Sequence, residues 1–486
     1  MKNKTDLGFL TAADFIKRRS PTLVDTPSAK LQEEYEVKRY LSKLDHQYAD
    51  EVKNLSLSDS QPCHKSARAI ITIIAYNEGS KIRKTLDNYL EQDLDPELFE
   101  IIVLDNHPHN SEGDNTRSEV ENFKKDNPNI SVIYAHKTWG ADELATVGNA
   151  RKYVFDIALT RLLTLGSREQ DTILVSNDAD TVSLQDNYLS SIISEFDTNK
   201  TVEALVTLSV VPISTLLKPN VYAALSLWDA LDDIVADGEP YNLIGRSSAY
   251  RASIYSAVGG YNPKGKMAGD LETGFLIADA RGWNPDCIIQ LKKTRHVQDP
   301  RRILEAVATR TPVNEMYYQF VSNPEIRNAD NDTLSDLISN NLDWELLEED
   351  LDSFWGGRMT GMYKWRGSRF ESDYAKAMER IGVEFKVVDN RVKITNIDKL
   401  LSGYEEFSGD KATVFHSEPR EWDQKRMDAM KEFFFSVTDS AIACRENMAE
   451  SIAEKIQLAM REGETAELDS LLGQFKRFAG HDYPQA

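Results

Sequence analysis

Apolar, mostly β-branched runs alternate with helix-like segments over residues 67–182, and this alternation constrains the fold more than any other feature. The runs are ARAIITIIA (67–75), FEIIVLDN (99–106), ISVIYAH (130–136) and TILVSND (172–178). An uninterrupted apolar run is typical of a strand buried on both faces of a parallel sheet, and strand–helix alternation indicates βαβ units. We therefore predict an α/β fold, Rossmann-like, with a mostly parallel sheet flanked by helices. No GxGxxG follows the first run, which disfavours classical dinucleotide binding.

The fourth run ends in two carboxylates, Asp178 and Asp180. In open α/β sheets, ligands bind at the edge where the strands end. Two carboxylates there repel each other unless a cation lies beside them, and hard oxygen ligands suit Mg²⁺ or Mn²⁺. The same cation could hold a diphosphate. The alternative is an ordinary Asp-rich turn, since Asp and Asn are common in turns.

Composition narrows the class of protein. The chain has 486 residues and a net charge of −22, which argues against nucleic acid or an anionic membrane as the main partner. No apolar run is long enough to span a membrane, and the N-terminus lacks the apolar core of a signal peptide. The three cysteines, Cys63, Cys287 and Cys444, lie far apart, as expected in a reducing compartment. These features favour a cytoplasmic protein.

The pattern divides the chain into three parts. Residues 1–66 are predicted to be a helical N-terminal arm and linker, because apolar residues recur at near-helical spacing in 29–52. Residues 67–325 hold the α/β domain. Residues 326–486 are predicted to be mainly helical, with a small hairpin in 384–397 around the turn VDNRV. The helical ends are expected to pack on the core or on another subunit, so a homo-oligomer is possible.

Five short motifs occur in a fixed order: AYNEG (75–79), VLDN (103–106), GNARK (148–152), NDAD (177–180) and AGDLETGF (268–275). In this order they resemble the GT-A glycosyltransferases, most closely the inverting family 2 type. The resemblance covers residues 68–310. It implies a GT-A fold with helical extensions, and an enzyme that moves a hexose from a nucleotide-sugar to a hydroxyl acceptor.

The resemblance also implies a donor site. The residues that would bind the nucleotide are Ala75, Tyr76, Asn77, Glu78, Asp105, Arg151 and Asp178, with Asp105 at the base. Mn²⁺ or Mg²⁺ would be held by Asp180, Asp178 and His296, and would offset the growing charge of the leaving diphosphate. An ordinary surface or capping histidine is the alternative for His296. UDP-sugar is the favoured donor, and GDP-mannose is an alternative.

Asp270 would be the general base that removes the acceptor proton in an inverting transfer; a carboxylate at a helix N-terminus is its simpler interpretation. The usual Glu-Asp pair is here Gly269-Asp270, with Glu272 two residues further on, so a retaining mechanism without a dedicated base stays open. The candidates on the acceptor side, for a glycan or small molecule, are Arg246, Ser247, Ser248 and Glu272.

A basic cluster follows the last motif: Lys292, Lys293, Arg295, Arg301 and Arg302. It could clamp a diphosphate or be solvated surface charge. Two other functions compete with sugar transfer. A sugar-phosphate nucleotidyltransferase should carry a Gly-rich basic loop after the first strand, and AYNEGSK has one Gly there. A non-catalytic scaffold or binding protein on a GT-A core is the remaining alternative, disfavoured by the intact Asp178, Asp180 and Asp270.

Overall fold

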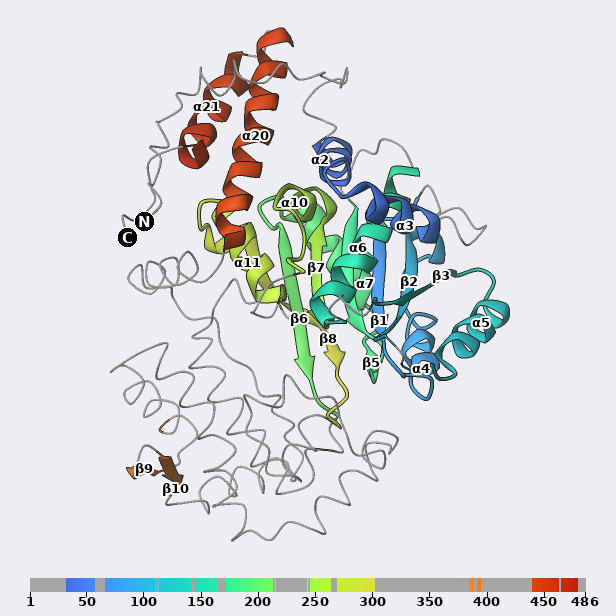
Figure 1. The fold of residues 1–486 in the computed structure, drawn as a ribbon. Helices are drawn as coiled ribbons and strands as arrows, with labels where there is room; N and C mark the ends of the chain where they lie inside the picture. The colour runs from blue at the N-terminus through green and yellow to red at the C-terminus, as the bar shows by residue number, and fades with distance from the viewer. Residues whose placement is uncertain are drawn as a thin grey trace, which may run out of the picture.

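An eight-stranded sheet forms the centre of the molecule (Figure 1). The structure, a computed structural model, describes residues 32–56, 66–109, 111, 113–140, 145–164, 172–212, 215, 243, 245–263, 269–301, 379, 384–388, 391–394, 439–462 and 465–479. The strands are β1 (Ala69–Ala75), β2 (Phe99–His107), β3 (Ser131–Thr138), β4 (Ile173–Asp178), β5 (Ser183–Leu184), β6 (Ala204–Val210), β7 (Ser247–Arg251) and β8 (Ile288–Val297). Their order is β3-β2-β1-β4-β7-β6-β8-β5.

The four predicted apolar runs form the parallel half of this sheet, β3-β2-β1-β4. Strand β7 is antiparallel to both its neighbours, β6 and β8 are parallel, and the short β5 is antiparallel to β8. The predicted α/β fold class, with a mostly parallel sheet between helices, is confirmed.

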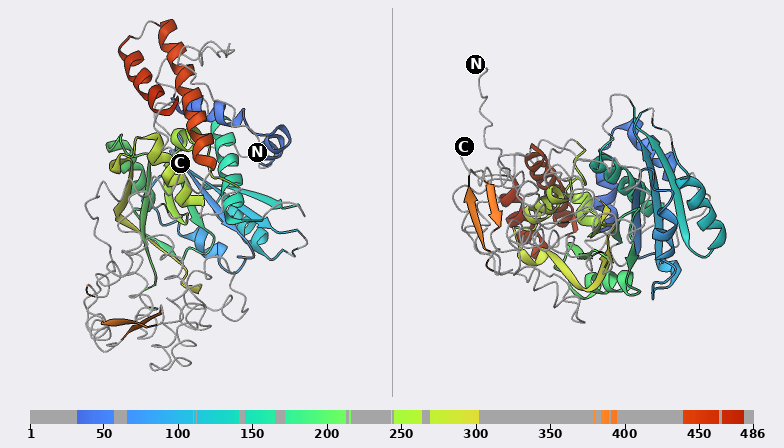
Figure 2. Two further views of the ribbon diagram at one scale, coloured as in Figure 1. Left: turned by 60° about the vertical axis from the view of Figure 1, so that its left-hand side comes forward. Right: turned by 90° about the horizontal axis from the view of Figure 1, so that it is seen from below.

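Helices cover both faces of the sheet (Figure 2). Along β1, Ile71 and Ile73 pack into one hydrophobic core while Ile70 packs into the other, since successive side chains of a strand point to opposite faces. One core includes α4 (Ile82–Asp87), α5 (Thr116–Asp126) and α7 (Tyr188–Thr198). The other includes α6 (Val147–Thr164), α10 (Ala252–Ala257) and α11 (Gly269–Ala280). This burial on both faces explains why the strands are apolar without alternation.

The N-terminal arm is helical, as its spacing predicts, but it is broken into α2 (Gln32–Leu41) and α3 (His46–Ser56). The break is at Asp45, whose Oδ1 accepts hydrogen bonds from the backbone N–H groups of Gln47 (2.9 Å) and Tyr48 (3.2 Å) and so caps α3. The arm is held to α6 by Asp156, a fully buried carboxylate. Tyr40 and Tyr48 donate to it at 2.7 Å each.

Helix α2 also contacts the C-terminal helix α20 (Asp439–Glu462), which is followed by α21 (Thr465–Ala479). Arg39 of α2 is buried and pairs with Glu450 (3.1 Å) and Glu454 (3.2 Å) of α20. Segments more than 400 residues apart in sequence therefore lie side by side on the α/β core. Within the described residues, the helical ends pack on each other and on the core of the same chain; the expected homo-oligomer stays a prediction.

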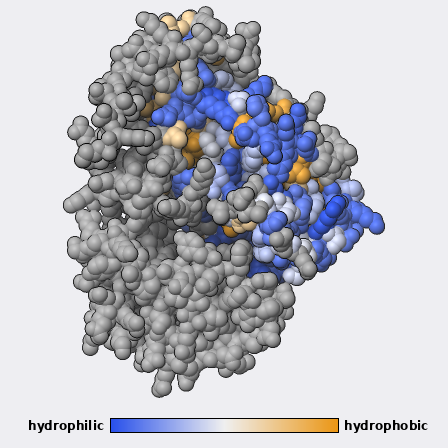
Figure 3. Space-filling model, viewed as in Figure 1, coloured by the Kyte–Doolittle hydropathy of each residue, from blue (hydrophilic) through white to orange (hydrophobic). Residues whose placement is uncertain are grey.

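The predicted hairpin is confirmed: β9 (Phe385–Val388) pairs antiparallel with β10 (Arg391–Ile394). Residues 1–31 and most of the region 326–438 lie outside the described residues, so the three-part division of the chain also stays a prediction. Among the residues described, no helix combines the length and apolar character needed to cross a membrane. Where described residues are visible in Figure 3, the surface is mostly hydrophilic, with apolar side chains scattered between.

Candidate active site

The carboxyl ends of β1, β2 and β4 lie together at one edge of the sheet. Asp105 of β2 is in register with Ala75 of β1, and Asp178 of β4 is in register with Ile74. After β1 the chain turns at Asn77, whose φ of 55° lies in the left-handed region that Asn tolerates better than most residues. Its side-chain Oδ1 is buried and has no hydrogen-bond partner among the described residues. The predicted nucleotide loop and the two predicted acidic positions therefore share one edge.

Arg151 of α6 joins two predicted site residues that are distant in sequence. Its Nη2 donates to Asp178 Oδ1 at 2.8 Å, and its Nη1 lies 4.0 Å from Asp270 Oδ2. Asp270 also accepts a hydrogen bond from the backbone N–H of Gly245 at 2.7 Å. Gly245 lies so close to the guanidinium that a Cβ there would be 2.0 Å from Nη1. One buried arginine thus brings the end of β4 and the start of α11 together.

Arg301 likewise joins two predicted site residues, Asp180 and Glu78. Its Nη2 donates to Asp180 Oδ2 at 2.7 Å and to Glu78 Oε2 at 3.2 Å. Asp299 pairs with Arg301 Nε at 3.1 Å and also with Lys81. The basic cluster therefore divides: Arg301 is buried in ion pairs within the site, whereas Lys292, Lys293 and Arg295 are exposed and Arg302 lies outside the described residues.

The carboxylates and arginines of the site shift each other's pKa values. Burial, and then the neighbouring Asp180, raise the pKa of Glu78 from 4.5 to about 7, against the opposing effect of Arg301. Burial alone would lower the pKa of Arg301, but Glu78 and Asp180 raise it above its ordinary value. Arg301 is therefore a fixed positive charge between two acidic groups, one of which titrates near neutral pH.

His296 of β8 lies beside these carboxylates. It is buried, and its Nε2 is 3.1 Å from Thr181 Oγ1, while its Nδ1 is buried with no hydrogen-bond partner among the described residues. Burial and the charge of Arg246 lower its pKa to about 4, although Asp178 and Asp180 act in the opposite direction. The ring is thus neutral near pH 7, which is the form that binds metal ions.

Two carboxylates and a neutral imidazole are a fitting donor set for Mn²⁺ or Mg²⁺. The arrangement, however, is held by arginines: Asp178 pairs with Arg151, and Asp180 with Arg301. Within the described part of the chain, the one set of three ligand groups whose atoms all lie within 4.8 Å of one another is a different one, Asp105, His107 and His136. The metal role of the predicted residues therefore stays a prediction.

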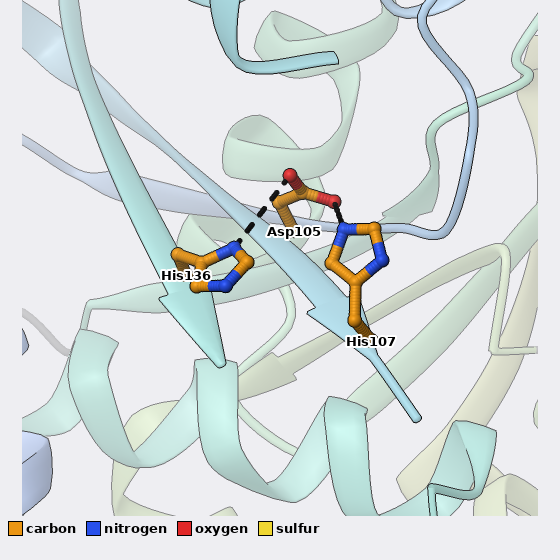
Figure 4. Close-up of side chains that lie close together, drawn as sticks. All are labelled: Asp105, His107 and His136. Carbon is orange, nitrogen blue, oxygen red and sulfur yellow. Dashed lines mark hydrogen bonds and ion pairs between the residues drawn. The ribbon is translucent and has the colours of Figure 1, made fainter. Parts of the chain in front are cut away.

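The set of Asp105, His107 and His136, which we call the Asp105 cluster, lies at the ends of β2 and β3 (Figure 4). The sequence argument singled out Asp105 and missed both histidines. Two signals could have found them: His107 is two residues after Asp105 on the same strand, and His136 ends the predicted strand ISVIYAH. Pairing of β2 with β3 then sets His136 directly opposite Asp105.

The predicted acceptor-side residues lie deeper in the molecule. Ser247 and Ser248 are fully buried in β7, between β4 and β6, and Ser248 shares a hydrogen bond with Tyr250 (3.0 Å). Glu272 is buried and accepts from Asn262 at 3.1 Å. Arg246 is half-buried and is close enough to His296 to lower its pKa. The structure thus brings Arg246 to the acidic edge and buries the two serines within the sheet.

A comparison with protein families matches part of the sheet region. Residues 70–259 match the family model described as Glycosyl transferase family 2. No curated protein sequence matches the chain significantly. Three solved structures are similar. A mannosyltransferase from Pyrobaculum calidifontis in complex with GDP-Man and Mn²⁺ is 15% identical; the match covers 85% of this chain and 94% of that chain, with a TM-score of 0.36. TarS 1-349 from S. aureus is 14% identical, with 68% of this chain and 96% of that chain covered and a TM-score of 0.33. Glucosyl-3-phosphoglycerate synthase from Mycobacterium tuberculosis, in complex with Mn²⁺, uridine diphosphate and glucosyl-3-phosphoglycerate, is 14% identical, with 50% of this chain and 77% of that chain covered and a TM-score of 0.29.

Proposed function

We propose, from the glycosyltransferase family 2 domain that residues 70–259 form, that this protein transfers a sugar from a nucleoside-diphosphate donor to a hydroxyl acceptor with the help of a divalent metal. The observation that carries the proposal is the bridging of Asp178 and Asp270 by Arg151. The two carboxylates are 92 positions apart in sequence (270 − 178). Their approach to the same guanidinium supports a donor-side role for Asp178 and an acceptor-side role for Asp270.

Asp180, Asp178 and His296 would hold Mn²⁺ or Mg²⁺. When bound, the ion would supply Lewis-acid stabilisation for the departing diphosphate. Arg301 pairs with Asp180 at 2.7 Å, so it places a guanidinium beside the carboxylate that would hold the ion. A guanidinium binds phosphate oxygens well, so Arg301 would also contact the diphosphate. Tyr76, Asn77 and the edge of β1 would receive the nucleoside.

Asp270 would act as the general base of an inverting transfer. Its Oδ2 is fixed by the Gly245 N–H, so the carboxylate is oriented before substrate binds. Asp270→Asn should then lower transfer by roughly 100-fold or more, the scale of general-base catalysis, while leaving donor affinity nearly unchanged. The anomeric configuration of the product, read by NMR, separates inversion from retention. Near-normal turnover, or a retained configuration, would remove Asp270 from this role.

Donor class is tested by titration calorimetry of the full chain with UDP and GDP, each with and without Mn²⁺. We expect one nucleotide to bind tightly only with metal, with a UDP-sugar as the favoured donor and GDP-mannose as the alternative. Asp180→Ala should abolish the metal dependence. Asp197→Ala, which removes the acidic partner of Arg68 away from the site, is the matched control and should bind as wild type. Absence of binding to both nucleotides would favour the scaffold function instead.

A further inference from the structure

The Asp105 cluster has the chemistry and geometry of a metal site of its own. Asp105 Oδ1 is 2.8 Å from His107 Nε2, and Asp105 Oδ2 is 3.8 Å from His136 Nδ1. Figure 4 shows the carboxylate between the two imidazoles, with both rings turned towards it. With one ligand atom taken from each of the three residues, these atoms all lie within 4.8 Å of one another. Two imidazoles and one carboxylate are a common ligand set for transition metals.

Regular secondary structure fixes these side chains. Asp105 and His107 are two residues apart along β2, so their side chains project from the same face of the sheet. His136 of β3 is paired in register with Asp105 of β2. Partners outside the three ligands orient them further. The hydroxyl of Tyr134 donates to Asp105 Oδ2 at 2.7 Å, and Ser111 Oγ lies 3.3 Å from His107 Nδ1. Such outer contacts are what hold ligands in the orientation that a metal needs.

We propose that the Asp105 cluster binds a transition-metal ion of the Zn²⁺ class, at a site separate from Asp178 and Asp180. Zinc lies about 2.0–2.2 Å from nitrogen and oxygen ligands, so at right-angle to tetrahedral geometry its ligand atoms are roughly 2.8–3.6 Å apart. The distances from His107 Nε2 to Asp105 Oδ1 (2.8 Å) and from His136 Nδ1 to Asp105 Oδ2 (3.8 Å) lie close to that interval. The two imidazoles approach different oxygens of the carboxylate, so side-chain rotation would direct all three groups at one ion.

Solvent access and the chemistry of the donor atoms also support a metal site at the Asp105 cluster. The side chain of His136 is 50% exposed, whereas those of Asp105 and His107 are buried, so one side of the cluster opens to solvent and leaves positions for water or another ligand. The two sites also differ in donor chemistry. Imidazole-rich ligation favours Zn²⁺ over Mg²⁺, whereas the oxygen-rich set of Asp178 and Asp180 favours Mg²⁺ or Mn²⁺.

The location gives the site a regulatory consequence, which rests on the proposed function. The ring of Tyr76, in the predicted nucleotide loop, packs edge-on against His107 with centroids 5.7 Å apart. Asp105 itself is expected to contact the base of the donor. An ion bound to Asp105 would occupy that carboxylate, so the cluster would act as an inhibitory zinc site that competes with the nucleotide.

The test is titration of the full chain with Zn²⁺ by calorimetry, and with Co²⁺ by visible spectroscopy, because Co²⁺ reports its ligands in its spectrum. The double variant His107→Ala/His136→Ala should lose affinity by at least about 100-fold. Asp178→Asn/Asp180→Asn should keep it, and so should His109→Ala, which removes an exposed histidine outside the cluster. Because His136 is half-exposed, His136→Gln is a milder second variant, with circular dichroism to confirm folding.

Unchanged Zn²⁺ affinity in both histidine variants, or absence of Zn²⁺ binding by the wild type, would overturn the site. Competition is measured separately, as UDP affinity in Mg²⁺ with and without one equivalent of Zn²⁺. A fall in UDP affinity that disappears in His136→Gln supports the inhibitory role, and simultaneous binding refutes it. Zn²⁺ binding by a chain that binds no nucleotide would uphold the metal site and contradict the proposed function, so the two failures are distinguishable.

Discussion

Replacement of Gly245 by alanine tests whether the guanidinium of Arg151 organises the site. The added methyl group would lie 2.0 Å from Arg151 Nη1 and 2.2 Å from its Cζ. The backbone at Gly245 does not have a positive φ, so alanine brings no conformational strain and its effect is steric alone. Arg151 is buried and has little room to move aside.

The size of the effect follows from these distances. A Cβ contact below 3.0 Å is essentially never seen, so Nη1 must move by about 1 Å, which can stretch the 2.8 Å bond from Arg151 to Asp178 beyond hydrogen-bonding range. Overpacking costs about 1–3 kcal/mol, and a lost hydrogen bond to a charged group costs about 1.5–3 kcal/mol. Because the Asp178 side chain is 30% exposed, water replaces part of that bond. We expect a loss of about 2–4 kcal/mol in the free energy of unfolding.

Urea denaturation measures this loss, and nucleotide titration in Mn²⁺ measures the accompanying fall in donor affinity. Gly473→Ala is the matched control, because Gly473 is an exposed position of helix α21 with no atom within 4 Å of a new Cβ. There the same substitution should stabilise the protein by about 0.5–1 kcal/mol. If Gly245→Ala behaves like Gly473→Ala in both measurements, the guanidinium of Arg151 does not organise the site.

Two further perturbations test buried charges. The pKa of His296 is lowered from 6.5 to about 4, so the unfolded chain binds a proton that the folded one does not, and stability falls by about 3 kcal/mol as the pH falls from 6.5 to 4. In urea denaturation across this interval, the His296→Gln variant should lack that loss of stability. Glu78 titrates in the wild type and in the variant alike, so its contribution cancels in the comparison. An equal pH dependence of the free energy of unfolding in the two proteins would contradict the lowered pKa of His296. Asp156→Asn should destabilise the protein by roughly 3–5 kcal/mol, because it removes a fully buried charge that pairs with half-buried Lys152, and should expose the α2–α3 arm to limited proteolysis. Asp197→Asn, at a more exposed pair, should cost less than about 1 kcal/mol; equal proteolysis of the two variants would count against the Asp156 contact.

The positions of the site residues were predictable where they follow directly from strand ends. Asp105 and Asp178 close apolar runs, and parallel strands carry such residues to one edge of the sheet, as the register of β1 with β2 and β4 confirms. His107 and His136 were missed. His107 could have been found from its place two residues after Asp105 on the same strand, whereas His136 becomes a neighbour of Asp105 through the pairing of β2 with β3. Arg301 was identified as part of a basic cluster, but its burial between Glu78 and Asp180 was not predictable from that cluster's composition.

The sequence by itself determined the fold class, the parallel half of the sheet and the candidate acidic edge, because hydrophobic periodicity and strand-end chemistry are local properties of the chain. Only the tertiary structure decided which side chains contact one another. Arg151 joins Asp178 to Asp270, and Arg39 joins the first described helix to α20, through contacts between segments that the chain separates by up to 415 positions. Ion pairs and hydrogen bonds of this kind depend on ångström-scale geometry after packing, and no pattern of neighbouring residues encodes that geometry.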